Sequence, residues 1–220
     1  MTKLLFIKAS PRGSDSRSVA VAEAYLSALK ASRPDVEIDV IDLWQEDLPE
    51  FDGNSSNAKL TIIKGGTLDD TQQTAWGQIS QIAGRFAAAD EYLFAVPMWN
   101  GGIPYRLKLY IDIIHQPGIL FGFDPASGYF GLLKGKTATL AYTSGVFAPD
   151  VDPRFGSDFH STYLKWWLGQ VGITAIQELR FQPTLRNADA EAAFALALAN
   201  ARQLAEDAVV SQVPLSTSSH

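Results

Sequence analysis

The strongest constraint on the fold is an alternation between short apolar runs and longer segments with helical periodicity. The runs at residues 3–8 and 91–97 are apolar almost throughout, which is typical of strands buried on both faces of a parallel sheet. Further strands are expected at residues 36–43, 136–143 and 174–181, and helices at residues 18–31, 71–88, 103–115, 158–169 and 188–209. Five strands that alternate with helices predict an α/β fold, a doubly wound five-stranded parallel sheet with helices on both faces.

The chain is expected to form one domain. Its 220 residues contain no internal repeat and no linker, and at about 150 residues per domain this length suits one large unit. We assign residues 1–210 to a single domain and the Ser/Thr-rich residues 211–220 to a flexible tail. Two stretches lack a clear period. Residues 44–71 are expected to form a long excursion with room for a short helix, and residues 119–130 a hairpin or a loop.

The composition excludes several kinds of chemistry. The chain has no cysteine, so thiol nucleophiles, disulfides and cysteine-based metal or iron–sulfur sites are ruled out. Its three histidines are too few for a multi-histidine site, and no metal is expected. A net charge of −6 without a basic stripe argues against a nucleic-acid partner. No apolar run approaches the ~20 residues of a membrane span, so a soluble, cytoplasmic protein is the expectation.

A polar loop follows the first predicted strand and leads into the first helix. In a doubly wound sheet, ligands bind beyond the carboxyl ends of the strands, and a helix N-terminus there favours an anion. Gly13 is the only glycine in the loop, so the GxGxxG fingerprint of dinucleotide-binding proteins is missing. A hydroxyl-rich loop suits one phosphate monoester, such as that of FMN, better than a pyrophosphate. The loop offers the hydroxyl groups of four serines as donors, Ser10, Ser14, Ser16 and Ser18. The alternative is a solvated loop in which Ser16 or Ser18 only caps the helix.

A second candidate segment ends the strand at residues 91–97 and comprises Pro97, Met98, Trp99, Asn100 and Gly101. Methionine and tryptophan offer a soft apolar surface, and asparagine offers both a donor and an acceptor. An isoalloxazine ring needs this mixture, because its benzenoid part is apolar and its pyrimidine edge is polar. The alternative is a strand-to-helix turn with a tryptophan in the core.

A third segment, Ser144, Gly145, Val146 and Phe147, follows the strand at residues 136–143. If the two strands are neighbours, its backbone N–H groups face the same crevice. Ser144 is not part of a GxSxG motif, so the nucleophile of a serine hydrolase is not indicated.

Together these segments resemble the family of FMN-dependent NADH-azoreductases and NAD(P)H:quinone oxidoreductases, which have a flavodoxin-like fold. The similarity rests on the serine loop, on PMWNGGIPYRLKLYIDIIHQPGILF at residues 97–121 and on GYFGL at residues 128–132, and it extends over residues 3–180. It implies non-covalent FMN, hydride transfer from NADH or NADPH, a quinone or azo acceptor, and a homodimer. It also implies that the FMN phosphate and ribityl end are held by Ser10, Ser16, Arg17 and Ser18. The isoalloxazine would be lined by Met98, Trp99, Asn100 and Gly101, and its pyrimidine side by Ser144, Gly145, Val146 and Phe147.

The sequence departs from the family pattern at two places. After the strand at residues 136–143 the family commonly has a Gly-Gly pair preceded by Arg, whereas this chain has Ser144-Gly145-Val146-Phe147. An aromatic residue is frequent in the family at the position of Gly101. Loss of that ring is expected to open the flavin face. The alternative function is a flavodoxin-like FMN electron carrier or redox-responsive binding protein without NAD(P)H turnover.

Other aromatic and histidine residues leave alternatives open. His160 is a candidate catalytic residue, because it begins a predicted helix; otherwise it is an exposed first-turn histidine. His115 is interpreted as structural or superficial. The aromatic residues of the segment 118–130 cover the core or contact a second subunit, and the same two alternatives apply to Tyr163 and the pair Trp166-Trp167.

Overall fold

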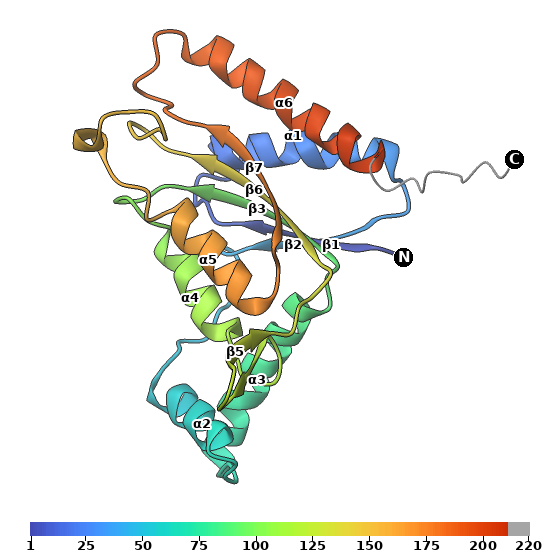
Figure 1. Ribbon diagram of the computed structural model, residues 1–220, viewed down its shortest axis with the longest axis vertical. Helices are drawn as coiled ribbons and strands as arrows, with labels where there is room; N and C mark the ends of the chain where they lie inside the picture. Colours follow the sequence, from blue (N-terminus) through green and yellow to red (C-terminus); the bar gives the residue numbers. More distant parts are fainter. Residues whose placement is uncertain (211–220) are drawn as a thin grey trace, which may run out of the picture.

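A computed structural model describes residues 1–210, and the predicted tail at residues 211–220 lies outside the described residues. Five parallel strands form one sheet in the order β2-β1-β3-β6-β7 (Figure 1). Their bounds are β1 Lys3–Lys8, β2 Glu37–Asp42, β3 Glu91–Pro97, β6 Thr137–Thr143 and β7 Ala175–Phe181. The predicted five-stranded parallel sheet is thereby confirmed, with each strand end within one residue of its expected position.

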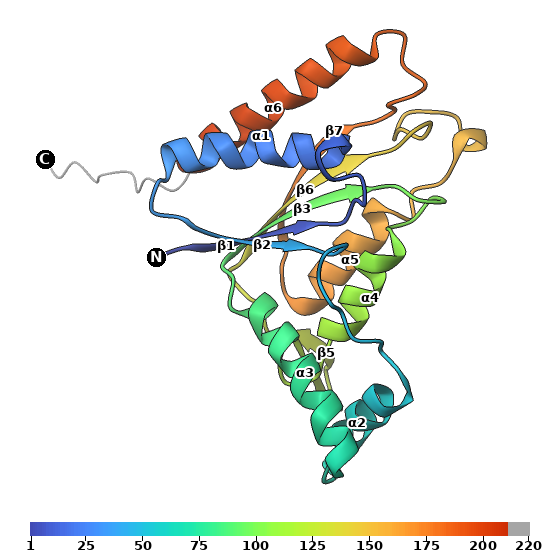
Figure 2. The ribbon, with the colours of Figure 1, turned by 180° about the vertical axis from the view of Figure 1, so that it is seen from behind.

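The helices cover both faces of the sheet (Figures 1 and 2). The upper face in Figure 1 carries α1 (Arg17–Ser32) and α6 (Ala190–Val210). The opposite face carries α3 (Asp70–Ala87), α4 (Tyr105–Ile114) and α5 (Ser161–Val171). Within residues 1–210, none of these helices combines the length and the apolar character that crossing a bilayer requires.

The core consists of two apolar layers, one on each side of the sheet. Successive residues of β1 point to opposite faces, so Leu5 and Ile7 pack in the layer under α3, α4 and α5. Leu4 and Phe6 pack in the layer under α1 and α6. All four side chains are buried. The doubly apolar pattern of this strand is therefore the direct consequence of helices on both faces.

The two stretches without a sequence period contain short regular elements. The excursion after β2 includes α2 (Gly53–Ile63), capped by Asp52, whose carboxylate accepts the Ser55 N–H. Residues 121–131 form the expected hairpin, with β4 (Phe121–Asp124) antiparallel to β5 (Gly128–Gly131). Figures 1 and 2 show α2 and the far end of α3 standing away from the sheet.

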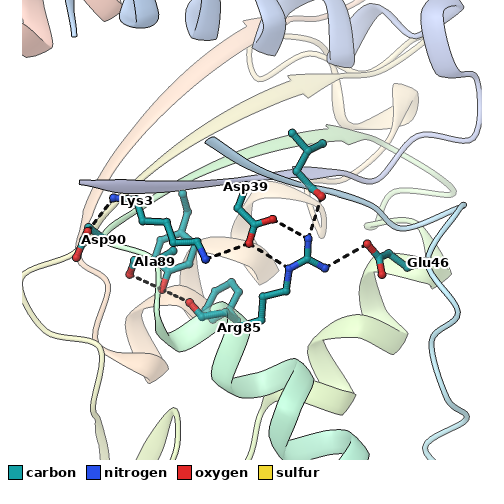
Figure 3. Close-up of polar contacts among 9 residues, drawn as sticks. Lys3, Asp39, Glu46, Arg85, Ala89 and Asp90 are labelled. Carbon is teal, nitrogen blue, oxygen red and sulfur yellow. Dashed lines mark hydrogen bonds and ion pairs between the residues drawn. The ribbon is translucent and has the colours of Figure 1, made fainter. Parts of the chain in front are cut away.

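The edge strand β2 is joined to α3 by one arginine (Figure 3). The Arg85 guanidinium donates to both Asp39 carboxylate oxygens, at 2.7 and 3.1 Å, and to the Glu46 carboxylate at 3.2 Å. This hydrogen-bonded pair lowers the pKa of the Asp39 carboxyl. Lys3 Nζ lies 3.3 Å from the same carboxylate. The Asp39 carboxylate on this edge strand is thus paired with the side chains of Arg85 and Lys3.

Candidate functional site

The three candidate loops leave the sheet on the same side, at the carboxyl ends of three strands. The strands β1, β3 and β6 are neighbours and parallel, so their carboxyl ends meet on the same side, at the left of Figure 1. Backbone hydrogen bonds join them directly. Ala9 N–H donates to Ala95 O at 3.0 Å, and Met98 N–H donates to Thr143 O at 2.7 Å. The chain changes its winding direction between β1 and β3, which is the position where doubly wound folds bind ligands.

The first loop presents three buried hydroxyl groups at the N-terminus of α1. Ser10, Ser16 and Ser18 are each at most 3% exposed, and the Oγ atoms of Ser16 and Ser18 lie 3.1 Å apart. Ser16 is the N-cap of α1, and its Oγ accepts the Val19 N–H at 3.4 Å. Ser16 therefore caps the helix, as the alternative interpretation of this loop expected. Ser18 does not act as a cap, and its hydroxyl lies in the first turn of the helix. Hydroxyl donors beside a helix N-terminus form a setting that suits a phosphate.

Arg17, the fourth residue predicted in this loop, is directed toward α6. Its guanidinium lies 4.1 Å from the ring centroid of Phe194 and 3.0 Å from the Glu191 carboxylate. It also lines a cavity of about 360 Å³ beside Ser16. A part in phosphate binding stays a prediction for this side chain, and its backbone N–H in the first turn of α1 is the group that the helix end offers.

The second loop is a tight turn. Trp99 and Gly102 exchange two backbone hydrogen bonds of 2.9 Å. The central residues Asn100 and Gly101 have φ values of 50° and 81°. Positive φ at both central positions is the requirement of a type I′ turn, for which Asn-Gly is a favoured pair. Gly101 is therefore required by the turn itself.

An aromatic group that the sequence interpretation missed lies behind this turn. The Trp44 ring is 5.7 Å from that of Trp99 and 5.4 Å from that of Tyr105, and Trp44 Nε1 donates to Ala9 O at 3.1 Å. Trp44 comes two residues after β2, which is the neighbour of β1 in the sheet. This position in the sequence was the signal that could have placed its ring near the loops. The Trp44 ring thus supports Trp99, whose side chain is half-buried.

The third loop is closed by its own serine and by a later segment. Ser144 is buried, and its hydroxyl donates to Phe147 O. Leu185 N–H donates to Gly145 O at 2.8 Å, and the Leu185 side chain lies where a Cβ on Gly145 would make contact. Val146 is 41% exposed, whereas Phe147 is buried. Because the Ser144 hydroxyl is bonded within its loop, it is not presented as a nucleophile.

His160 is located differently from both sequence expectations. Its ring is fully buried, so it is neither an exposed first-turn residue nor open to a substrate at the surface. Nε2 lies 3.1 Å from Val96 O, and the ring packs edge-on against Tyr142 at 4.6 Å. Burial lowers the pKa of this histidine to about 4. The geometry is that of a neutral hydrogen-bond donor to the end of β3.

An apolar hollow of about 520 Å³ lies next to the turn. It is formed between the start of α4 and the outer face of α5, and it includes Ile103, Phe159, Tyr163 and Trp166. Phe159 and Trp166 are 69% and 57% exposed. A flat aromatic molecule or another protein surface would find an apolar contact here.

Comparison with known proteins finds related sequences that match nearly the whole chain. The family described as flavodoxin-like fold matches residues 2–205. An FMN-dependent NADH:quinone oxidoreductase of Ruegeria pomeroyi is 54% identical over 199 residues, which cover 90% of this chain and 98% of that protein. FMN-dependent NADH:quinone oxidoreductase 2 of Pseudomonas syringae pv. tomato is 44% identical, with 92% and 97% covered.

Similar folds are also found among solved structures. The azoreductase from Bacillus anthracis str. Sterne superposes with a TM-score of 0.85 at 27% identity, covering 94% of this chain and all of that one. An FMN-dependent NADH-azoreductase from Bacillus anthracis str. Ames Ancestor, solved in complex with FMN, gives a TM-score of 0.80 at 27% identity, with 96% and 99% covered. The chain belongs to the family of FMN-dependent NADH:quinone oxidoreductases, within the flavodoxin-like fold.

Proposed function

We propose that this protein binds FMN non-covalently and transfers electrons from NADH or NADPH to a quinone or an azo compound. The main support is structural: the three loops that follow β1, β3 and β6 lie together at the switch point of the sheet. The 54% identity to a relative with this name, over nearly its full length, supports the same activity. The bound flavin supplies the redox chemistry, accepting a hydride from the nicotinamide and passing two electrons to the acceptor.

The donors of the first loop fit the phosphate end of this cofactor. Ser10, Ser16 and Ser18 are buried hydroxyls at a helix N-terminus, and each donates a charge-assisted hydrogen bond to a phosphate oxygen in the proposal. The unpaired N–H groups of the first turn of α1 add to them, because the helix dipole is positive at this end. These neutral donors suit a single terminal phosphate, and the Arg17 side chain beside Ser16 stays a predicted further contact.

The second and third loops fit the ring system. Trp99 and Met98 supply the apolar contact, and the exposed Asn100 supplies a donor and an acceptor at the polar edge. Backbone N–H groups of residues 144–147 would lie at the pyrimidine side and would stabilise negative charge there electrostatically. The Phe159 ring lies 3.6 Å from where a Cβ of Gly101 would be. This places an aromatic ring beside the position where the family commonly has one.

The apolar hollow beside the turn suits the flat acceptor and a second subunit. Trp166 borders this hollow and also a cavity of about 820 Å³ that extends to the hairpin residues Phe123 and Tyr129. These aromatic side chains are exposed in the isolated chain, and a contact with another copy would bury them. We include a homodimer in the proposal, with the substrate entering along its interface.

The proposal also includes the domain organisation and the location of the protein. Residues 1–210 act as a single domain, since one sheet with helices on both faces accounts for both apolar layers. The location is cytoplasmic, where the nicotinamide donor is available.

The decisive experiment is flavin extraction followed by stepwise reduction. We expect the purified protein to be yellow, to release FMN on denaturation, to bleach with NADH under nitrogen and to recover its absorbance with a quinone. A protein that takes up no FMN would contradict the proposal. A protein that binds FMN but does not oxidise NADH or NADPH with any acceptor would instead be the electron carrier.

A further inference from the structure

The loop that precedes α5 contacts the end of β3 at two points. Phe159 N–H donates to Gly101 O at 3.0 Å, within the type I′ turn. The His160 ring bonds Val96 O at 3.1 Å, one residue before Pro97. One dipeptide therefore reaches both the base and the tip of the segment that carries Met98, Trp99 and Asn100.

The histidine has a defined protonation state in this position. A carbonyl oxygen only accepts hydrogen bonds, so Nε2 carries the proton and Nδ1 is a bare acceptor. Nδ1 is buried and has no hydrogen-bond partner among residues 1–210. A buried acceptor without a partner lowers the stability of the folded protein, so the imidazole ring is less favourable here than an apolar side chain of the same size. The compensating interactions are the bond to Val96 and the edge-on packing against Tyr142.

The tip of the turn fits closely against the same loop. A Cβ at Gly101 would lie 3.4 Å from Ser157 O and 3.6 Å from the Phe159 ring. Because the two segments are 55 or more residues apart along the chain, nothing local holds them together. The contacts at Val96 and at Gly101 join the two segments directly.

We propose that Phe159 and His160 form a clamp on the end of β3, in which His160 is a positioning residue for the flavin-binding turn at residues 97–102. The clamp rests on the proposed function, since its purpose is to hold Met98, Trp99 and Asn100 in place for FMN. His160 itself does not touch the cofactor; it acts through Val96 and the strand end.

The test compares three substitutions. In His160→Leu the donor to Val96 is lost while an apolar side chain fills the space. In His160→Gln the amide nitrogen takes the place of Nε2 and restores the donor. The matched control is His115→Leu, which removes another histidine whose pKa burial lowers to about 4. His115 follows α4 at its far end, about 15 Å from the turn by the rise of a ten-residue helix, and its Nδ1 accepts from Trp167 Nε1.

Two measurements are needed for each variant. The first is amide hydrogen exchange of residues 98–102 in the flavin-free protein, which reports on the turn without any cofactor. The second is the FMN dissociation constant, with the visible circular dichroism of bound FMN. We expect His160→Leu to raise the dissociation constant about five- to tenfold, the usual effect of one hydrogen bond, to change the flavin dichroism and to speed exchange at the turn. His160→Gln should restore all three, and His115→Leu should leave them within twofold of the wild type.

The outcomes separate the clamp from the proposed function. Wild-type protein that fails to bind FMN overturns the proposed function, and unchanged exchange in His160→Leu then overturns the clamp independently. Wild-type binding of FMN together with equal affinity and exchange in His160→Leu overturns the clamp alone. Equal losses in His115→Leu would mean a general effect of removing a buried histidine and would also overturn it. If His160→Leu does not fold, His160→Asn, whose shorter amide cannot reach Val96 in the same way, takes its place.

Discussion

Ser16 and Ser18 are two residues apart and have different duties. The Ser16 hydroxyl caps α1 through the Val19 N–H, whereas Ser18 lies inside the first turn and bonds only its neighbour's hydroxyl among the described side chains. Both are buried. Loss of a cap destabilises a helix by about 1 kcal/mol, whereas loss of a donor to a bound phosphate lowers the affinity for the ligand. The two effects are separable at this site.

We therefore predict different results for single alanine substitutions. Ser18→Ala should weaken FMN binding by about 1–2 kcal/mol with little change in the stability of the flavin-free protein. Ser16→Ala should weaken binding similarly and also destabilise the protein by about 1 kcal/mol. Ser27→Ala, an exposed position of the same helix, is the control and should change neither. Calorimetric titration and urea unfolding give the two quantities; equal FMN affinity in all three variants would return the loop to a purely capping role.

The His160 ring predicts a pH dependence of stability. Its pKa is about 4 in the folded protein because of burial, against about 6.5 in an unfolded chain. Between these values the unfolded state binds more protons, so stability is complete above about pH 6.5 and is lost as the pH falls toward 4. The loss from this group is about 3 kcal/mol.

His160→Gln removes this titration. We expect its unfolding free energy to fall less between pH 7 and pH 4 than that of the wild type, by about 3 kcal/mol. Asp158, Glu178 and Arg180, which act electrostatically on the imidazole, are present in both proteins, as is the Tyr142 ring, so the difference reports on His160. Parallel stability curves for the two proteins would show that the ring titrates normally.

At the scale of elements, the β4–β5 hairpin is seated by backbone contact rather than by side chains alone. A Cβ on Gly131 would lie 2.1 Å from Gly172 N and 2.2 Å from Val171 C, at the end of α5. Leu133 N–H donates to Val171 O at 2.9 Å immediately beyond the hairpin. The hairpin thus approaches α5 as closely as two main chains can, which brings Tyr129 and Phe123 near Trp166.

Gly131→Ala should consequently destabilise the protein by about 1–3 kcal/mol, the usual range for overpacking, and displace the hairpin from α5. The control is Gly77→Ala in α3, where an added methyl group meets no atom within 4 Å. That substitution should stabilise the protein by up to about 1 kcal/mol, because alanine is the better helix former. Thermal unfolding of both variants is the measurement, and a neutral Gly131→Ala would mean that the hairpin is not held at this contact.

At the scale of the whole molecule, the two helical faces differ in what they leave uncovered. On one side, α1 and α6 pack on the sheet and on each other. On the other, α5 and the hairpin expose a group of aromatic side chains that includes Phe159 and Trp166. The sheet edge with the three loops adjoins this second face. A partner that covers the aromatic group would thereby also enclose the proposed flavin site.

Trp166→Lys should therefore convert the proposed dimer into a monomer and reduce quinone turnover, while FMN binding through the first loop persists. Leu196→Lys is the matched control, because Leu196 is similarly exposed, at 61%, but lies on α6 on the opposite face. Light scattering after size-exclusion chromatography gives the mass of each. A monomeric wild type, or a Trp166→Lys variant that stays dimeric, would contradict this assignment of the interface.

The five strands, the five helices that pack on the sheet and the three loops that follow strands could be predicted from the sequence, because each depends on a pattern within a few neighbouring residues. Continuous apolar runs specify strands buried on both faces, whereas the strand order β2-β1-β3-β6-β7 came from the structure. The contacts of the long side chains could be seen only in the folded protein. Arg17 turns to Glu191 and Phe194, and Trp44 supports Trp99. His160 bonds Val96, 64 residues away. Such contacts depend on distances between elements, which no local periodicity encodes.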